Sequence, residues 1–132
     1  MSLTTAGIEA EQKARLWIKS KGYNNLQQID WIIKSHKTKK FLVVEVKHRE
    51  LFNPPPFFGT GLDINQINLR RQLYDDFEID TLLLVFEIGT ENIYYNFLFS
   101  VLEKLDVKDK FDTKNGIRIY NIDKFIKETF KC

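Results

Sequence analysis

The chain has 132 residues, of which 43% are hydrophobic and 14% aromatic, and a net charge of +2. This length fits one domain with one core, and the composition is typical of a folded globular chain, which excludes a disordered one. No apolar run approaches the roughly 18 residues of a membrane helix, and no secretion signal is visible. We therefore expect a cytoplasmic protein that does not enter a membrane. The one cysteine, Cys132, excludes disulfide frameworks and cysteine-rich zinc sites.

The charges are distributed unevenly along the chain. Residues 1–71 hold 12 Lys and Arg against 6 Asp and Glu, a net +6, whereas residues 72–132 hold 8 against 12, a net −4. A basic half in a nearly neutral protein suggests one surface that binds a polyanion. The alternative is that the two halves fold onto surfaces of mixed charge.

Hydrophobic periodicity predicts the first elements. Residues 5–21 read as a helix that ends at Gly22, with an apolar stripe that includes Ala10, Ala14 and Trp17. Glu11 lies at the edge of this stripe, where a solvated position is the alternative to a functional one. Residues 26–35 and 41–47 read as two strands, and the second is apolar until it reaches Glu45 and Lys47. Side chains alternate along a strand, so Glu45 and Lys47 leave by the same face.

The two strands are expected to form a hairpin, because only a short polar segment separates them. If the turn is centred between Lys37 and Thr38, Asp30 lies opposite Glu45, and Ile32 faces Val43. Opposed carboxylates repel at this spacing unless a cation lies between them. A slip of one residue would move Asp30 to the other face.

The later segments predict an α/β chain. Residues 48–63 read as a loop around Pro54-Pro55-Pro56, whose phenylalanines either stack on unpaired bases or fold over the core. Residues 63–77 read as a helix with Gln66 and Arg70 on one face, where they enter a polar site or line the edge of the core. Further predicted elements are an interior strand at 80–88, strands at 93–99 and 117–120, a short helical piece at 100–105, and a closing helix at 122–130.

These motifs together resemble the PD-(D/E)XK nuclease superfamily, including its Holliday-junction-resolvase-like members. Asp30 matches the first acidic ligand, Glu45-Val46-Lys47 matches the E-x-K element, and Gln66 matches the fourth motif. The helix Gly7 to Ala14, with Glu11, looks like the first helix of the resolvase-like members. The resemblance covers residues 5 to about 88 and implies a restriction-endonuclease-like fold of α/β class. That fold has three α/β/α layers around a central mixed sheet, in the order αββαβ, here followed by extra strands and a C-terminal helix within one domain, 1–132.

The resemblance also implies a function and a site. The expected activity is Mg²⁺-dependent hydrolysis of DNA phosphodiester bonds, with Mn²⁺ as a substitute. Asp30, Glu45 and the carbonyl of Val46 would hold the metal, and Glu11 would reach it through water. Lys47 would orient the attacking water or stabilise charge on the phosphate. The DNA strand would be positioned by Gln66 and by the basic residues Lys34, Lys37, Lys39, Lys40, Arg70 and Arg71.

Two other functions remain open at this stage. The same fold can serve as a catalytically inactive nucleic-acid-binding or assembly subunit. The motif match can also be accidental, in which case the chain is an unrelated α/β interaction module. A homodimer is expected for a nuclease that cuts both strands, because double-strand cleavage usually needs two active sites.

Overall fold

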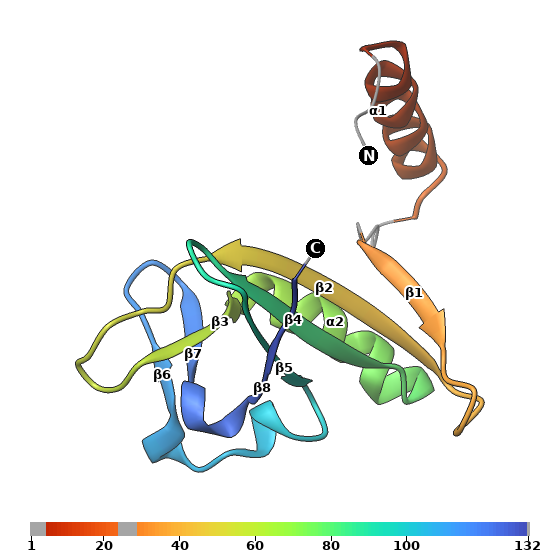
Figure 1. Cartoon of the computed structure of the whole chain (residues 1–132). Helices are drawn as coiled ribbons and strands as arrows, with labels where there is room; N and C mark the ends of the chain where they lie inside the picture. The colour runs from red at the N-terminus through yellow and green to blue at the C-terminus, as the bar shows by residue number, and fades with distance from the viewer. Residues whose placement is uncertain (1–4, 24–28, 132) are drawn as a thin grey trace.

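The structure is a computed structural model that describes residues 5–23 and 29–131. Within these ranges the chain is a mixed α/β protein with two α-helices, a five-stranded mixed sheet and a three-stranded sheet (Figure 1). The helices are α1 (Thr5–Ser20) and α2 (Ile64–Phe77). The five-stranded sheet has the order β1-β2-β4-β5-β8, with bounds Trp31–Lys34, Phe41–Arg49, Asp80–Glu87, Asn92–Phe97 and Ile126–Thr129. The three-stranded sheet has the order β3-β7-β6, with bounds Gly59–Asp63, Ile117–Asn121 and Lys110–Asp112.

Strands β1 and β2 form the predicted hairpin in the predicted register. Ile32 pairs with Val43, and Lys34 pairs with Phe41. The Ser35 N–H closes the turn by donating to the Lys40 carbonyl at 2.9 Å. The expected strand started earlier than β1, but residues 24–28 lie outside the described part of the chain. The register fixes which residues of the hairpin share a face, since side chains alternate with a period of two.

Strand β4 is the interior strand that the apolar run predicted. It lies between β2, to which it is parallel, and β5, to which it is antiparallel. Parallel neighbours need a crossover connection, and α2 supplies its helix. The helix ends where Glu78 adopts a left-handed conformation (φ 57°) and its N–H donates to the Tyr74 carbonyl at 2.9 Å. The short step from α2 to β4 makes the helix antiparallel to both β2 and β4.

The two faces of the five-stranded sheet are covered differently. Leu83 and Val85 on the inner face are fully buried. They share one core with Ile67 of α2 and Leu62 of the three-stranded sheet. Leu84 and its alternate neighbours point to the opposite face, called the outer face here, and are only partly buried. We expected other elements to pack on both faces of β4. Among the described residues, no helix or second sheet packs on its outer face (Figure 1).

Helix α1 forms where it was predicted but stands away from both sheets (Figure 1). It ends at a turn in which Gly22 has φ 89° and donates its N–H to the Lys19 carbonyl. The Trp17 side chain is 62% exposed. The α/β class and the central mixed sheet are therefore confirmed, whereas the three α/β/α layers and the single domain stay predictions. Among the described residues, no helix is both long enough and apolar enough to cross a bilayer.

The predicted C-terminal helix is wrong. Residues Ile122–Lys124 form one 3₁₀ turn, in which the Asn121 side chain accepts from the Asp123 N–H at 3.1 Å, and β8 follows. β8 pairs with the edge of β5, with Ile126 opposite Tyr95. The segment forms a strand because the free edge of β5 offers hydrogen-bond partners to its backbone. Its β-branched residues also favour a strand over a helix.

Strand β3 lies inside the segment that was predicted to be a loop. Its two glycines, Gly59 and Gly61, are required by how closely β3 approaches β7. A Cβ atom on Gly61 would lie 1.7 Å from the Arg118 carbonyl oxygen, and one on Gly59 would lie 2.4 Å from that of Tyr120. Only glycine permits this contact between the two backbones.

Gly61→Ala is therefore expected to lower the free energy of unfolding by about 3 kcal/mol, because the new methyl group must push β3 from β7. Urea unfolding followed by circular dichroism measures the change. Gly89→Ala is the control: it meets no atom within 4 Å and carries only the cost of its φ of 79°, about 1 kcal/mol. Equal losses in the two variants would contradict the close approach of the strands.

Candidate active site

Glu45 is the most deeply buried carboxylate of the predicted site. It lies in the middle of β2, is 2% exposed and points to the inner face. The Nε–H of Arg70 donates to its Oε1 at 2.8 Å, and Nη2 of the same guanidinium donates to the same oxygen. Arg70 is itself 2% exposed. Because a buried charge requires a partner, this ion pair explains how Glu45 is tolerated inside an apolar strand.

Asp30 lies beside Glu45, as the hairpin register predicted. The β1–β2 pairing, extended by one residue, sets Asp30 opposite Glu45. The Val46 N–H donates to Asp30 Oδ2 at 2.9 Å, so this carboxylate is held against the backbone of β2. Asp30 is exposed and Glu45 is buried, so the two residues lie at the boundary between the solvent and the protein interior. The same hydrogen bond also gives Asp30 a purely structural role, which is to close the strand ladder.

Lys47 and Gln66 lie on the same side of the Glu45–Arg70 ion pair, toward the C-terminal end of β2 and the N-terminal end of α2. Lys47 follows Glu45 on the same face of β2, about 7 Å along the strand. Gln66 precedes Arg70 by one turn, about 6 Å along a helix that runs antiparallel to β2. The side-chain Oε1 of Gln66 is buried and has no hydrogen-bond partner among the described atoms. A buried amide oxygen without a donor is costly, which is consistent with a ligand at this position.

Arg49 is a site residue that the sequence reasoning missed. It follows Lys47 on the same face at the end of β2, and its position in an alternating Glu45, Lys47, Arg49 row was the available signal. Burial lowers the pKa of Arg49, and the charge of Asp63 at the start of α2 partly opposes this shift. The guanidinium keeps its proton at all working pH values. Arg49 therefore adds a fixed positive charge near Lys47.

Glu11 is not brought to this cluster. It lies on α1, which stands apart from the hairpin, so its expected contact with a metal through water stays a prediction (Figure 1).

The six basic residues predicted to bind DNA divide into two groups. Lys34, Lys37, Lys39 and Lys40 are exposed on the β1–β2 hairpin, and Lys40 lies 3.6 Å from the exposed Glu78 carboxylate. Arg70 is buried against Glu45 and does not present its guanidinium to the solvent in this structure. Positioning of Glu45, rather than contact with a DNA strand, is the role that this geometry supports.

Arg71 belongs to a second charged cluster, centred on Glu103. Glu103 accepts hydrogen bonds from Arg71, from Arg118 at 2.8 Å and from the Tyr120 hydroxyl at 2.7 Å. Burial, followed by the charge of Glu103, raises the pKa of Tyr120 well above its usual range. The cluster joins α2 to β7, and it holds Arg71 against Glu103, so the predicted contact of Arg71 with DNA stays a prediction.

The proline loop folds against itself. Phe52 and Gly59 exchange two backbone hydrogen bonds, at 2.9 and 3.1 Å, which close the loop. Phe52 and Phe57 are partly buried, whereas Phe58 is 51% exposed. Of the three phenylalanines, Phe58 is the one that can reach an external base.

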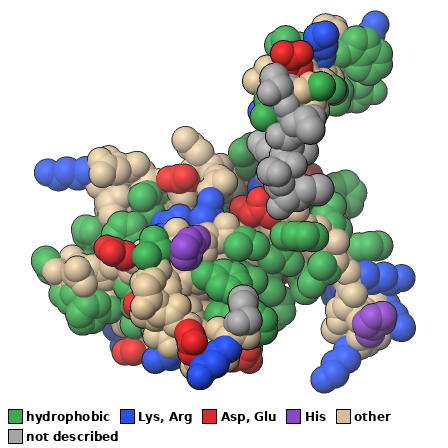
Figure 2. All heavy atoms as spheres, turned by 45° about the horizontal axis from the view of Figure 1, so that its top comes forward, with side chains coloured by type: hydrophobic (Ala, Val, Ile, Leu, Met, Phe, Trp, Pro, Cys, Tyr) green, Lys and Arg blue, Asp and Glu red, His purple; other side chains and the backbone are tan. Residues whose placement is uncertain are grey.

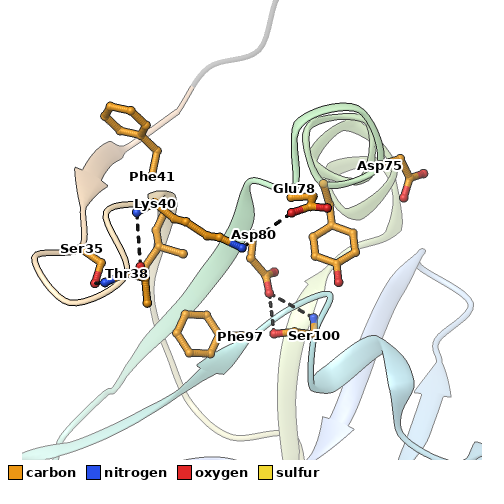
Figure 3. Close-up of a pocket in the computed structure, with 11 residues that line it drawn as sticks. Ser35, Thr38, Lys40, Phe41, Asp75, Glu78, Asp80, Phe97 and Ser100 are labelled. Carbon is orange, nitrogen blue, oxygen red and sulfur yellow. Dashed lines mark hydrogen bonds and ion pairs between the residues drawn. The ribbon is translucent and has the colours of Figure 1, made fainter.

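A cavity of about 680 Å³ lies at the other end of β2, between the hairpin turn and the end of α2. Figure 3 shows Lys40 reaching toward Glu78 on one side, and Asp80 beside Ser100. Asp80 is buried, and its oxygens accept from the N–H groups of Thr81, Phe99 and Ser100 and from the Ser100 hydroxyl. These bonds account for the carboxylate, so the cavity adds no reactive group. It is distinct from the Asp30–Glu45 site, because neither carboxylate lines it and its nearest β2 residue, Leu42, precedes Glu45 by three residues, about 10 Å.

The donor set suits Mg²⁺ in type. Mg²⁺ prefers hard oxygen ligands and is usually held by one or two carboxylates, with several waters kept. Asp30, Glu45 and the unpartnered Oε1 of Gln66 are such oxygens, and Val46, which directly follows Glu45, has a backbone carbonyl that could add another. The described residues contain no group of three or more His, Cys, Asp or Glu side chains placed to hold a metal. Metal binding by this site stays a prediction.

No protein-family model matches this chain, and no curated protein matches it either.

Proposed function

We propose that this chain is a metal-dependent DNA endonuclease with the site design of the PD-(D/E)XK superfamily, which its sequence resembles. The observation that supports this most is the position of Asp30 opposite Glu45, with Lys47 next on the same face of β2. The helix that faces these residues adds Gln66, whose amide oxygen is buried without a partner. Glu45 is compensated by Arg70, whereas the buried Oε1 of Gln66 lacks a donor, and such an oxygen is costly unless it binds something.

In this proposal Asp30, Glu45 and the Val46 carbonyl hold Mg²⁺, or Mn²⁺ in its place, and Gln66 lies within reach. When bound, the metal makes hydroxide available near neutral pH and neutralises charge on the phosphate. Arg70 is a positioning residue, because its two hydrogen bonds fix the orientation of Glu45. Asp30 is oriented in the same way by the Val46 N–H.

Lys47 would donate a hydrogen bond from its ammonium group to a phosphate oxygen, or orient the attacking water, and would keep its proton throughout. It is partly buried, and among the described residues it makes no ion pair or side-chain hydrogen bond, so its charge is available to a ligand. A positive charge in a partly desolvated site stabilises developing negative charge more strongly than in water. Arg49 and the exposed lysines of the hairpin would bind flanking phosphates.

The cleavage experiment uses three DNA forms: supercoiled plasmid, single strands and branched junctions. Each is incubated with the whole chain in Mg²⁺, in Mn²⁺ and in EDTA. The proposal predicts cleavage of at least one form with either metal and none in EDTA. Equal cleavage in EDTA would contradict a metal mechanism, and the absence of cleavage in every condition would contradict an active nuclease.

A second candidate function, DNA binding without cleavage, is favoured by one observation. Arg70 already provides a cation for Glu45 Oε1, and such a pair can maintain the fold without any metal. The exposed hairpin lysines would then carry the function. Salt-sensitive binding by a chain that cuts none of the three DNA forms would favour this alternative.

Both functions predict that the hairpin lysines contribute to DNA affinity. Replacing Lys37 and Lys39 together by Gln is expected to weaken binding and to reduce the slope of log K against log[salt] by about 2, because two phosphate contacts are lost. Fluorescence anisotropy at several salt concentrations measures both quantities. Lys104→Gln/Lys108→Gln is the matched control, because it removes the same charge from exposed positions that are distant in sequence from the hairpin. A salt slope that falls equally in both double variants would show that net charge, and not the hairpin, governs binding.

A further inference from the structure

The outer face of the five-stranded sheet is largely apolar and carries exposed side chains on both of its edge strands, whereas Val44 and Ile93 in its middle are buried. Strand alternation and the observed register place Trp31 and Ile33 of β1 on this face, next to Val44 and Leu42 of β2. The face continues through Leu84 of β4 to the far strands. Trp31 is 64% exposed, Ile33 is 43% exposed, and Phe97 of β5 and Ile126 of β8 are 37% and 50% exposed. Monomeric proteins rarely expose contiguous apolar patches larger than a few hundred Å², so a face of this kind indicates a binding surface.

Helix α1 carries the complementary surface. At 100° per residue, Ala6, Ala10, Ala14 and Trp17 fall within one stripe. All four are exposed, and Trp17 is 62% exposed. Small alanines allow a helix to approach a sheet closely, and a large aromatic side chain anchors it. In Figure 2 apolar side chains are visible both on this helix and across the middle of the body, and the two groups are separated.

We propose that a second copy of this chain covers the outer face with its α1, and that the two copies exchange this helix reciprocally. Each chain supplies one helix with an apolar stripe and one sheet face with exposed apolar side chains, so a two-fold exchange covers both the stripe and the sheet face in each copy. In the structure α1 stands off the end of β1 and away from its own sheet, which is the arrangement that an exchanged helix requires (Figure 1). The inference is independent of the proposed nuclease activity.

The two tryptophans alone supply about a third of the area of a standard interface. A buried tryptophan contributes about 150–250 Å², so covering the exposed parts of Trp17 and Trp31 in both copies would bury roughly 500 Å². That is about a third of a standard interface of 1,600 Å², before the aliphatic residues of the sheet and the alanines of the helix are counted.

The two tryptophans of the chain report on the two sides of this contact separately, because Trp17 lies on α1 and Trp31 on β1. Trp17→Phe and Trp31→Phe each leave a single emitter. Light scattering is expected to give twice 15.7 kDa at micromolar concentration, with blue-shifted emission from both single-tryptophan variants. On dilution the mass should halve, and both emissions should shift to the red over the same concentration range.

Ala14→Glu, in the apolar stripe, is expected to give a monomer with red-shifted Trp31 emission, and Ile33→Glu on the sheet should do the same from the other side. Gln12→Glu adds the same charge on the opposite side of α1 and should leave the dimer intact. A monomer whose Trp31 emission is blue-shifted at every concentration would overturn the proposal, because α1 would then cover its own sheet. A dimer that survives both Ala14→Glu and Ile33→Glu would also overturn it, because the interface would lie elsewhere.

Discussion

Arg70→Met is expected to lower the free energy of unfolding by about 3–5 kcal/mol, which is a large share of the stability of a domain this size. The reason is that Glu45, 2% exposed, loses both hydrogen bonds from Arg70 and remains as a buried, unpaired carboxylate. Methionine keeps most of the side-chain volume, so little of the loss comes from packing. Urea unfolding at neutral pH measures the change in midpoint and slope.

A double-mutant cycle separates the ion pair from the packing. Glu45→Gln/Arg70→Met removes both charges and should recover much of the stability that Arg70→Met loses, since no unpaired charge then remains in the core. Lys108→Met, at an exposed position, is the control for replacing a cation by methionine. A loss below about 1 kcal/mol in Arg70→Met would show that Glu45 finds another partner or takes up a proton easily.

Lys47→Ala is expected to reduce the cleavage rate by about 100- to 1,000-fold, with little effect on stability. The proposed role of the ammonium group is to stabilise charge that appears only as the phosphodiester bond breaks. Among the described residues it makes no ion pair or hydrogen bond whose loss would weaken the fold. Single-turnover cleavage of the DNA form that the wild type cuts best isolates the chemical step.

Lys114→Ala provides the comparison, since Lys114 is exposed on the loop before β7. It removes the same charge from a position remote in sequence from the hairpin, and its cleavage rate should stay within about twofold of the wild type. A Lys47→Ala variant that cuts at the wild-type rate would remove Lys47 from the proposed mechanism. Equal losses in both variants would point to a general effect of charge on DNA binding.

Local rules were enough to predict the hairpin and its register. The apolar run after Phe41 and the polar turn centred between Lys37 and Thr38 fixed the register, and a side-chain period of two then placed Asp30 opposite Glu45. The limits of α2 and the interior position of β4 followed from equally local patterns. These features depend on residues that are close in sequence.

The features that were not predicted depend on contacts between distant segments. The partner of Arg70 is 25 residues away, and nothing in the helix pattern distinguishes a guanidinium that binds DNA from one that binds Glu45. β3 was taken for a loop because its glycines serve an approach to β7 that only the folded chain reveals. β8 was taken for a helix because the free edge of β5 decided its conformation. The distance of α1 from the sheet likewise follows from no local pattern.

The cleavage rate of Asp30→Asn as a function of Mg²⁺ concentration tests the proposed metal site most directly. Asparagine keeps an oxygen that can accept from the Val46 N–H, so the hairpin is preserved while one carboxylate charge is lost. Glu50→Gln is the matched control at an exposed position just after β2. The proposal predicts a loss of about 100-fold or more at low Mg²⁺ for Asp30→Asn, recovered in part as Mg²⁺ rises, and a wild-type profile for Glu50→Gln. A wild-type rate and Mg²⁺ dependence in Asp30→Asn would contradict a metal held between Asp30 and Glu45.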